Sequence, residues 1–481
     1  MDALRAFAPT ASQPWDAPTA AHLARRAGFG ARPEEISELV ALGPVDAVER
    51  FVGEPERDEA LEAELESLGP ELDLAGMEPG AYGGQTFDLL RRRWIYRMVR
   101  GRTPLTEKLA LFWHDHFACQ SSKVVRTWLC HQQLELFRAH ALGSFRSLLG
   151  AVASNPAMLV FLDNRLSEKS APNENWAREL MELFTLGVDR YSQRDVTELA
   201  RVFTGWTTER ADSTEFVYDP ELHDEDDKSL LGQVIAGRSG EAGRREGHEA
   251  LELLLGRRDC ALFLADKLAR WFAQHEPPAE VVEALADTLV ENDYQLRPTL
   301  RRLFRSAWFY APEQRFALYK NPVELLVGAC RLLDLNNPHL FHPERHAHAM
   351  GMRLFEPPSV AGWDHGPEWV RTGTVAPRLN LALDLSEQAH ASRSVAGRCS
   401  LDLDALAGTS ESGQAADELV DALGARLLQR PLEDEQRAAL IELVDSYGTP
   451  PSDEREARRF RRARVRAALH LCLACPQFTL A

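Results

Sequence analysis

The 481-residue sequence predicts an all-α fold: a multi-helix globular bundle with long irregular loops and a small helical unit at its C-terminus. Apolar residues recur at helical spacing between a proline and acidic start and a glycine end, as in PEEISELVALG. Strand-like alternation with turn dipeptides is scarce. No period of 20 to 50 residues repeats along the chain, so a solenoid is not expected.

In chain order, four units are predicted. Residues 1–86 form an N-terminal helical segment that closes with a loop rich in glycine and proline at 66–86. Residues 87–394 form a helical core that carries the polar motifs. A linker at 395–415 then leads to a C-terminal helical unit at 416–481.

Within the core, periodicity and capping residues predict helices at 87–102, from 104 through two histidines, at 144–160 with a break at Asn155-Pro156, at 174–186, at 195–205 and between 249 and 333. Residues 207–248 lose helical periodicity, which indicates a long functional loop or a small hairpin insertion. FEPPSVAGWDHGPEW, 355–369, holds three prolines and two glycines between aromatic anchors. We expect it to be an ordered loop that lies against another part of the protein.

Composition excludes several classes of function. A formal net charge of −18 argues against binding to nucleic acid or to an anionic membrane surface, since both need excess Lys and Arg. There is no run of 18 uncharged apolar residues and no signal-peptide pattern at the N-terminus, so we expect a soluble, cytoplasmic protein. The seven scattered cysteines fit reduced core thiols.

The stretch FWHDHFACQ, 112–120, places polar side chains in an apolar and aromatic run. Burial of an unpaired polar group costs roughly 2 to 7 kcal/mol, so these side chains are either satisfied in the core or line a site. At about 100° per residue, His116 falls inside the apolar arc with Trp113, while His114 points about 160° away. Unless the helix breaks there, the two histidines therefore cannot hold one metal ion together, and His114 is expected either to support the site from behind or to pack in the core.

A second stretch, NENWARELMELFTLG at 173–187, places carboxylates beside apolar residues. On the same helical wheel Glu179 lies inside the apolar arc, and Asn175 and Glu182 lie beside it. We expect the three side chains to form one stripe that points at the core or at a cleft. A buried carboxylate needs a charged partner, hydrogen bonds or a metal ion. An ion pair that joins helices without chemistry stays open, and the Glu-x-x-His repeat of di-iron bundles is absent.

The acidic stretch DPELHDEDDKSLLG, 219–232, supplies His223 and Asp224. A solvated acidic loop is the simplest interpretation, because the order of acidic residues in a calcium loop is not met. Both residues become candidate ligands if the loop folds back toward His116 and Glu179.

Long motifs in a fixed order identify a relationship. LALFWHDHFA, NENWARELMELFTLGVDRYSQRDVTELARVFTGW and MGMRLFEPPSVAGWDHGPEW resemble the large bacterial family catalogued as domain of unknown function 1800. The resemblance implies a mainly helical protein, often exported and often encoded beside a sulfatase-like or phosphatase-like partner. This sequence departs from that pattern by lacking an export leader, and the resemblance assigns no residue a role.

Two hypotheses follow. The first is an enzyme with a divalent cation, iron, manganese or zinc, that does oxidative or hydrolytic chemistry on a small or sugar-like substrate. Its predicted ligands are His116, Glu179, Glu182, His223 and Asp224, its predicted catalytic residues are His116, Arg178, Glu179 and Glu182, and its predicted substrate contacts are Trp113, Asn175, Trp206 and Trp363.

A metal-free variant of this enzyme uses Glu179 as a general base whose pKa burial raises. The second hypothesis is a non-catalytic helical scaffold or partner protein, in which the same side chains form a buried polar network.

Overall fold

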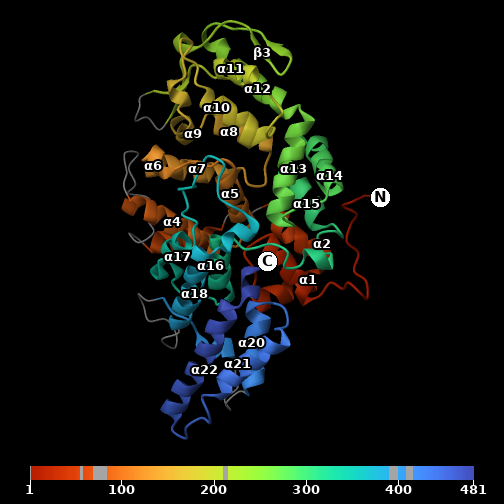
Figure 1. The fold of residues 1–481 in the computed structure, drawn as a ribbon, viewed down its shortest axis with the longest axis vertical. Helices are drawn as coiled ribbons and strands as arrows, with labels where there is room; N and C mark the ends of the chain where they lie inside the picture. The colour runs from red at the N-terminus through yellow and green to blue at the C-terminus, as the bar shows by residue number, and fades with distance from the viewer. Residues whose placement is uncertain (1, 55–57, 69–83, 210–214, 389–398, 408–414) are drawn as a thin grey trace.

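The structure is a computed structural model, and it describes residues 2–54, 58–68, 84–209, 215–388, 399–407 and 415–481. Helices dominate these residues, as the sequence predicts, and within them β-structure is confined to two small hairpins (Figure 1). No helix in the described ranges is long and apolar enough to cross a membrane.

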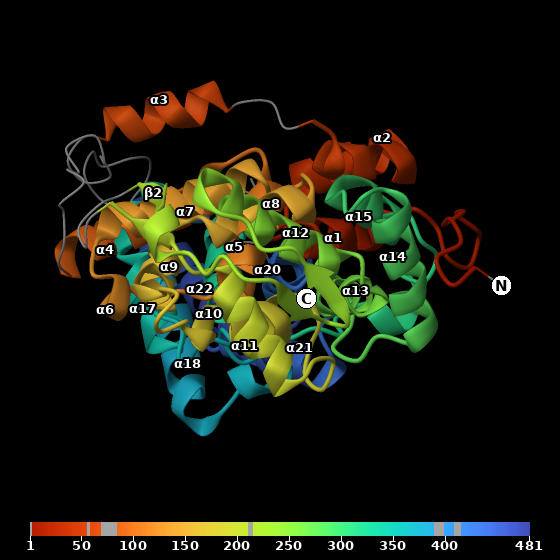
Figure 2. The same cartoon turned by 90° about the horizontal axis from the view of Figure 1, so that it is seen from above.

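The N-terminal part contains four helices: α1 (Ala17–Arg26), α2 (Pro33–Val52), α3 (Glu59–Ser67) and α4 (Gly84–Arg100). Asp16 caps α1 by accepting the Thr19 N–H at 3.0 Å, and a proline follows it at the first turn, where no N–H is needed. Figure 2 shows α3 at one edge, above α4 and apart from most of the other helices. Most of the predicted loop at 66–86 lies outside the described residues.

Helix α5 (Pro104–His116) runs through the centre of the core, and residues 107–119 are all buried. A helix that is apolar nearly all round is expected to be covered on every side. Helix α5 packs on α7 (Thr127–Ala139). Helix α7 in turn contacts α6 (Ser121–Val124), α8 (Phe145–Ala153) and α9 (Pro156–Phe161). The break predicted at Asn155-Pro156 is observed, because the Asn155 side chain caps α9.

Helix α10 (Glu174–Glu179) continues into a π-helical turn, η3 (Leu180–Thr185), before α11 (Gln193–Val202) begins at a capping box of Ser192 and Asp195. A π-helical turn holds more residues than an α-helical turn, so it changes the direction in which the following side chains point.

The non-helical insertion predicted at 207–248 consists of two antiparallel hairpins. Strand β1 (Trp206–Thr208) pairs with β2 (Phe216–Tyr218), with Trp206 opposite Tyr218. Strand β3 (Lys228–Leu230) pairs with β4 (Gln233–Ile235), with Lys228 opposite Ile235. Figure 1 places β3 beside α11 and α12 at one end of the molecule.

The second half of the core is again helical: α12 (Arg244–Leu255), α13 (Arg258–Phe272), α14 (Ala279–Glu291), α15 (Leu296–Phe304), α16 (Pro322–Leu332), α17 (Pro343–Ala349) and α18 (Thr372–Glu387). Single turns of 3-10 helix join these elements, at Asn164–Leu166, Pro220–Leu222, Gly240–Gly243, Pro312–Gln314, Pro338–Phe341, Gly366–Trp369 and Pro476–Thr479. Helix α13 packs closely along α14, and α16 packs on α4.

The C-terminal helices α20 (Ala416–Leu427), α21 (Asp434–Asp445) and α22 (Glu454–Ala474) gather at the opposite end from the hairpins (Figure 1). Helix α22 joins them to the core by packing on α18. The predicted linker at 395–415 lies largely outside the described residues, and its described part includes the short helix α19 (Leu403–Ala407).

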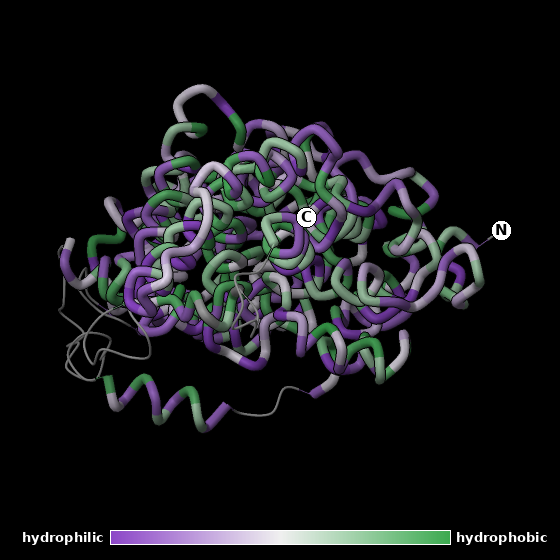
Figure 3. The backbone as a smooth tube through the Cα atoms, turned by 90° about the horizontal axis from the view of Figure 1, so that it is seen from below, coloured by the Kyte–Doolittle hydropathy of each residue, from purple (hydrophilic) through white to green (hydrophobic). Residues whose placement is uncertain are grey.

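One extensive cluster of buried hydrophobic residues extends from α1 to α22. Hydrophobic and hydrophilic residues alternate along the chain trace in Figure 3, as expected for helices that bury one face. Under α3, a separate small cluster of Leu61, Leu65 and Tyr96 holds that helix against α4.

Candidate functional site

A cavity of about 310 Å³ opens where α5, α13 and the loop 355–369 meet. This volume is at the lower end of the range for small-molecule sites. Its wall combines aromatic side chains, Phe112, Phe263, Trp271, Tyr319 and Trp369, with polar ones, Asp115, His116, Asp266, Lys267, Arg270, His275, Asn321, Glu324 and His365. Convergent polar groups in an apolar cavity are the usual composition of a ligand site.

The loop reaches the cavity by binding α5 through two backbone N–H groups. Trp363 donates its N–H to Asp115 Oδ1 at 2.8 Å, and Phe355 donates its N–H to His114 Nε2 at 2.9 Å. Gly362 has a φ of +90°, and a Cβ there would lie 2.4 Å from Asp115 Oδ1. Only glycine therefore lets the loop approach the helix this closely. The prediction that this loop is ordered and lies on another element is confirmed.

His114 has a packing role, one of the two expected for it, although it is as buried as His116 because the loop covers its side of α5. Its ring packs against those of Trp94 and Phe355, with centroids 5.3 and 4.8 Å away. Burial lowers the pKa of His114 to about 3, so the ring is neutral and its Nε2 accepts the Phe355 N–H.

His365 and Asp115 form a pair at the mouth of the cavity. His365 Nε2 lies 3.2 Å from Asp115 Oδ2, with the histidine side chain half exposed and the aspartate buried. Desolvation lowers the pKa of His365, but the hydrogen bond to Asp115 and the charge of that carboxylate outweigh it. The pKa of His365 is raised as a result, which favours the imidazolium form.

Lys267 and His116 form a second pair, deeper in the cavity. His116 Nε2 lies 3.2 Å from the Phe184 carbonyl oxygen, which can only accept, so Nε2 carries the proton. Nδ1 is then an acceptor, and Lys267 Nζ donates to it at 3.2 Å. Burial and the lysine charge keep the pKa of His116 well below its ordinary value.

The environment of Lys267 also disfavours its charged, ammonium form. Desolvation lowers the pKa of Lys267, and the charges of Asp115 and Asp266 offset this only in part. Within the described residues Lys267 makes no ion pair; its second contact is the Leu183 carbonyl oxygen at 3.5 Å. The cavity thus holds one group pushed toward its neutral form and another pushed toward its charged form, which is how acid and base roles are separated in one site.

The carboxylates predicted as metal ligands on α10 and η3 lie outside this cavity. Glu182 accepts a short hydrogen bond from the Tyr191 hydroxyl, and Glu179 is half-buried beside it. Burial and the charge of Glu182 raise the pKa of Glu179, as expected for the metal-free variant. Arg178 pairs with Glu174 at 3.2 Å. In the described structure neither glutamate is bonded to His116.

The expectation that Asn175, Glu179 and Glu182 form one stripe facing the core is wrong for Asn175, which is exposed. The buried face of α10 and η3 consists of Trp176, Ala177, Leu180 and Met181. The π-helical turn also ends the regular 100° progression on which the stripe was drawn.

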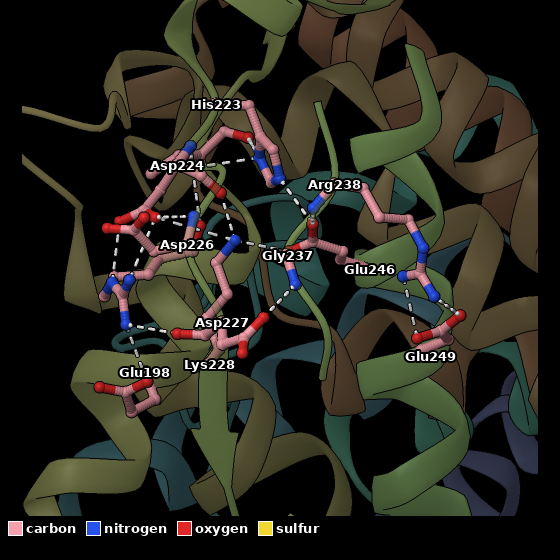
Figure 4. A network of polar contacts seen from close by, with 12 residues as sticks. Glu198, His223, Asp224, Asp226, Asp227, Lys228, Gly237, Arg238, Glu246 and Glu249 are labelled. Carbon is pink, nitrogen blue, oxygen red and sulfur yellow. Dashed lines mark hydrogen bonds and ion pairs between the residues drawn. The ribbon is translucent and has the colours of Figure 1, made fainter. Parts of the chain in front are cut away.

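His223 and Asp224 belong to a third group of contacts, drawn in Figure 4, and the solvated loop expected for them is wrong for His223, which is 1% exposed. His223 Nδ1 lies 2.9 Å from the Thr204 carbonyl oxygen, and Nε2 lies 3.3 Å from Glu246 Oε1. Both ring nitrogens therefore face protein oxygens. Arg201 holds Asp224 with two hydrogen bonds of 2.8 and 3.1 Å.

The five predicted ligands are thus divided among three separate groups of contacts. Across the described ranges, no group of three or more His, Cys, Asp or Glu side chains is arranged to hold a metal ion. The metal site stays a prediction that this arrangement does not support.

The predicted substrate contacts Trp113 and Trp206 are fully buried in the core, and neither lines the cavity. Trp113 packs on Phe117, and Trp206 packs on Phe203. Trp363 contributes its backbone N–H to Asp115, while its ring packs on His114 at 5.3 Å.

Lys267, Trp271, Asp115 and His365 were not among the predicted site residues. The helix DCALFLADKLARWF carries a usable signal, because Phe263, Lys267 and Trp271 are spaced by four and share one face. A lysine inside an aromatic stripe is rare enough to mark a site.

A larger cavity of about 590 Å³ lies between α2, α3 and the end of α4. Its arginines are paired with carboxylates, for example Arg50 with Glu38 and Arg100 with Glu64. These groups satisfy one another, and the cavity borders segments outside the described residues, so it does not define a site.

The fold and cavity define a mainly helical protein with a polar site enclosed between helices and a long ordered loop. The chain belongs to the family described as "Protein of unknown function (DUF1800)", whose model matches residues 22–480. No curated protein and no solved structure matches the chain.

Proposed function

We propose that the chain is an enzyme that performs acid–base chemistry on a small substrate in the cavity between α5, α13 and the loop 355–369. The observation that carries this proposal is the presence of Lys267 and the His365–Asp115 pair in one aromatic-lined cavity. Lys267 supplies the base, and the His365 imidazolium, held by Asp115, supplies the acid.

The lining indicates the kind of substrate. Trp271 and Trp369 offer flat apolar faces, and polar groups line the same cavity. A sugar-like molecule, with one apolar ring face and several hydroxyl groups, suits this division. The sulfatase-like or phosphatase-like partner and the cytoplasmic location belong to the same proposal as expectations from family resemblance and from sequence.

The acid–base proposal differs from the metal-dependent one in the residues that it needs. It requires Lys267 and His365 and leaves Glu179 and Glu182 outside the chemistry. The non-catalytic alternative is supported for His223 and Asp224, whose contacts are internal to the network of Figure 4.

The test is a screen of monosaccharides and their aldehyde, ketone and acid derivatives for turnover by the full chain. For any compound that is turned over, we expect Lys267→Met and His365→Asn each to lower the rate by about 10² to 10⁴, the usual contribution of one acid or base. Lys169→Met is the matched control, because Lys169 is an exposed lysine outside the cavity lining. A substrate whose turnover survives both cavity substitutions would refute the proposal.

A further inference from the structure

We propose that Lys267 is a nucleophile that forms an imine with the carbonyl carbon of an aldehyde or ketone substrate. This inference rests on the proposed function, because it uses the same cavity, and it names the chemical class of the substrate.

The first argument is the placement of this amine among the lysines of the chain. The sequence contains six lysines, all within the described residues: Lys108, Lys123, Lys169, Lys228, Lys267 and Lys320. Three of them are paired with carboxylates at 2.6 to 2.9 Å: Lys108, Lys123 and Lys228. Such an ion pair occupies the amine, which is then not free to attack a carbonyl group.

Of the remaining lysines, Lys320 has the most perturbed environment. Burial lowers the pKa of Lys320 to about 7, but its Nζ is bound to the Phe478 carbonyl oxygen at 2.8 Å. The space beside it is about 10 Å³, which is room for a single water molecule. Lys320 is therefore too enclosed to meet a substrate, and Lys169 is exposed to solvent. Lys267 alone among the six lines the 310 Å³ cavity.

The second argument is the set of groups that face Lys267. Both of its hydrogen-bond partners are uncharged: His116 Nδ1 and the Leu183 carbonyl oxygen. The ring of Phe263 lies under the amine, with its centroid 5.1 Å from Nζ. Desolvation in a mostly apolar setting is a recognised way to keep a lysine nucleophilic.

The third argument is that an acid, His365, lines the same cavity as Lys267. Imine formation begins when the neutral amine attacks the carbonyl carbon: a C–N bond forms, and the π electron pair moves to the oxygen, which takes a proton from His365. The nitrogen then loses a proton to the imidazole, which restores the imidazolium.

The same acid, His365, then promotes the loss of water from the addition product. His365 protonates the hydroxyl group, water leaves with the C–O bonding pair, and the nitrogen lone pair completes a protonated imine. Asp115, 3.2 Å from His365 Nε2, stabilises the imidazolium before each transfer. The overall change is one amine, one carbonyl group and the proton of the His365 imidazolium to one iminium, one water and a neutral His365, which regains its proton from solvent.

The test is reductive trapping. The full chain is incubated at pH 7 with glyceraldehyde and sodium cyanoborohydride, and the alkylation of each lysine is followed over time by peptide mass spectrometry. We expect Lys267 to be labelled at least about tenfold faster than Lys169, which corresponds to a difference of one pKa unit in amine availability. Lys320 is expected to stay unlabelled. His365→Asn should slow the labelling of Lys267 and leave that of Lys169 unchanged.

The comparison between lysines uses the parent protein, so it does not depend on any variant folding. Labelling of Lys267 no faster than that of Lys169 would overturn the imine proposal. If Lys267→Met still abolished turnover of a substrate in that case, Lys267 would be a base and the proposed function would stand without the imine.

Discussion

Replacement of Lys228 by Met tests whether the region of His223 and Asp224 is a structural network. Lys228 Nζ lies 2.6 Å from Glu246 Oε2, and both side chains are 0% exposed. Removal of one partner from a buried ion pair costs roughly 3 to 5 kcal/mol, because the other charge stays buried. Glu246 retains the Arg238 N–H, a donor at 2.7 Å, and His223. We therefore expect a loss of about 3 kcal/mol, the lower end of that range.

The pH dependence of the free energy of unfolding gives a second test of this prediction. Desolvation raises the pKa of Glu246, but the hydrogen bonds from His223 and Lys228 outweigh it and lower the pKa below its ordinary 4.5. In the parent protein this carboxylate therefore stabilises the fold above about pH 4.5 and loses that effect as the pH falls through its folded-state pKa. Without Lys228, burial dominates and the carboxylate opposes folding when charged. The destabilisation by Lys228→Met should then be largest at pH 7 and shrink toward pH 4.

The assay is equilibrium unfolding in urea at both pH values, with hydrogen exchange of residues 223–238 to localise the effect. Lys123→Met is the matched control: Lys123 pairs with Asp163 at 2.7 Å, but its side chain is 42% exposed, so we expect a change within about 0.5 kcal/mol. Addition of Glu246→Gln to Lys228→Met should recover part of the lost stability, since the buried charge is gone. A loss below about 1 kcal/mol at pH 7 would refute the structural role of this pair.

Three further predictions concern the cavity and the metal. Asp115→Asn should lower the pKa of His365, because desolvation would then act without the carboxylate charge; an unchanged histidine titration by NMR would show that Asp115 does not set it. Gly362→Ala should cost about 1 to 3 kcal/mol in urea unfolding, since φ is +90° and the Cβ would meet Asp115 at 2.4 Å, whereas Gly373→Ala, with no atom within 4 Å, should not. Elemental analysis of chelator-free protein should give less than about 0.1 metal ion per chain, with no difference in Glu179→Gln, because the predicted ligands do not converge; one metal per chain, lost in the variant, would restore the metal-dependent hypothesis.

The elements that could be predicted from sequence are those encoded by neighbouring residues. The break between α8 and α9 follows from Asn155 and Pro156 alone, since the asparagine caps the helix that the proline begins. The inward position of His116 likewise follows from the spacing of apolar residues around it. These signals act within one or two helical turns, so they need no knowledge of the tertiary fold.

The candidate site could not be predicted from the sequence in the same way, because its residues come from segments that are far apart in the chain. His365 and Asp115 are 250 positions apart in the sequence, and Gly362 is the residue that lets their two segments touch. A helical wheel shows that a side chain points inward but not what it meets. For Asn175 even the direction was wrong, since it is exposed. Beyond Leu180 the π-helical turn also departs from the regular helix on which the direction of Glu182 was predicted.

The contrast between the two polar groupings is the strongest reason to place the chemistry at the cavity. In the network of Figure 4, Lys228 is bound by Glu246 and by the Asp224 carbonyl oxygen, and Arg201 closes on Asp224, so charge is neutralised where it is buried. A grouping of this kind stabilises one arrangement of the chain. Lys267 faces open volume with only neutral partners, and His365 is half exposed beside it. Among the described residues Lys267 makes no ion pair, and the charges of Asp115 and Asp266 offset its desolvation only in part. A fold selected for stability alone would gain by pairing such a lysine directly with a carboxylate, and the missing pair is explained if the amine is kept reactive for a ligand.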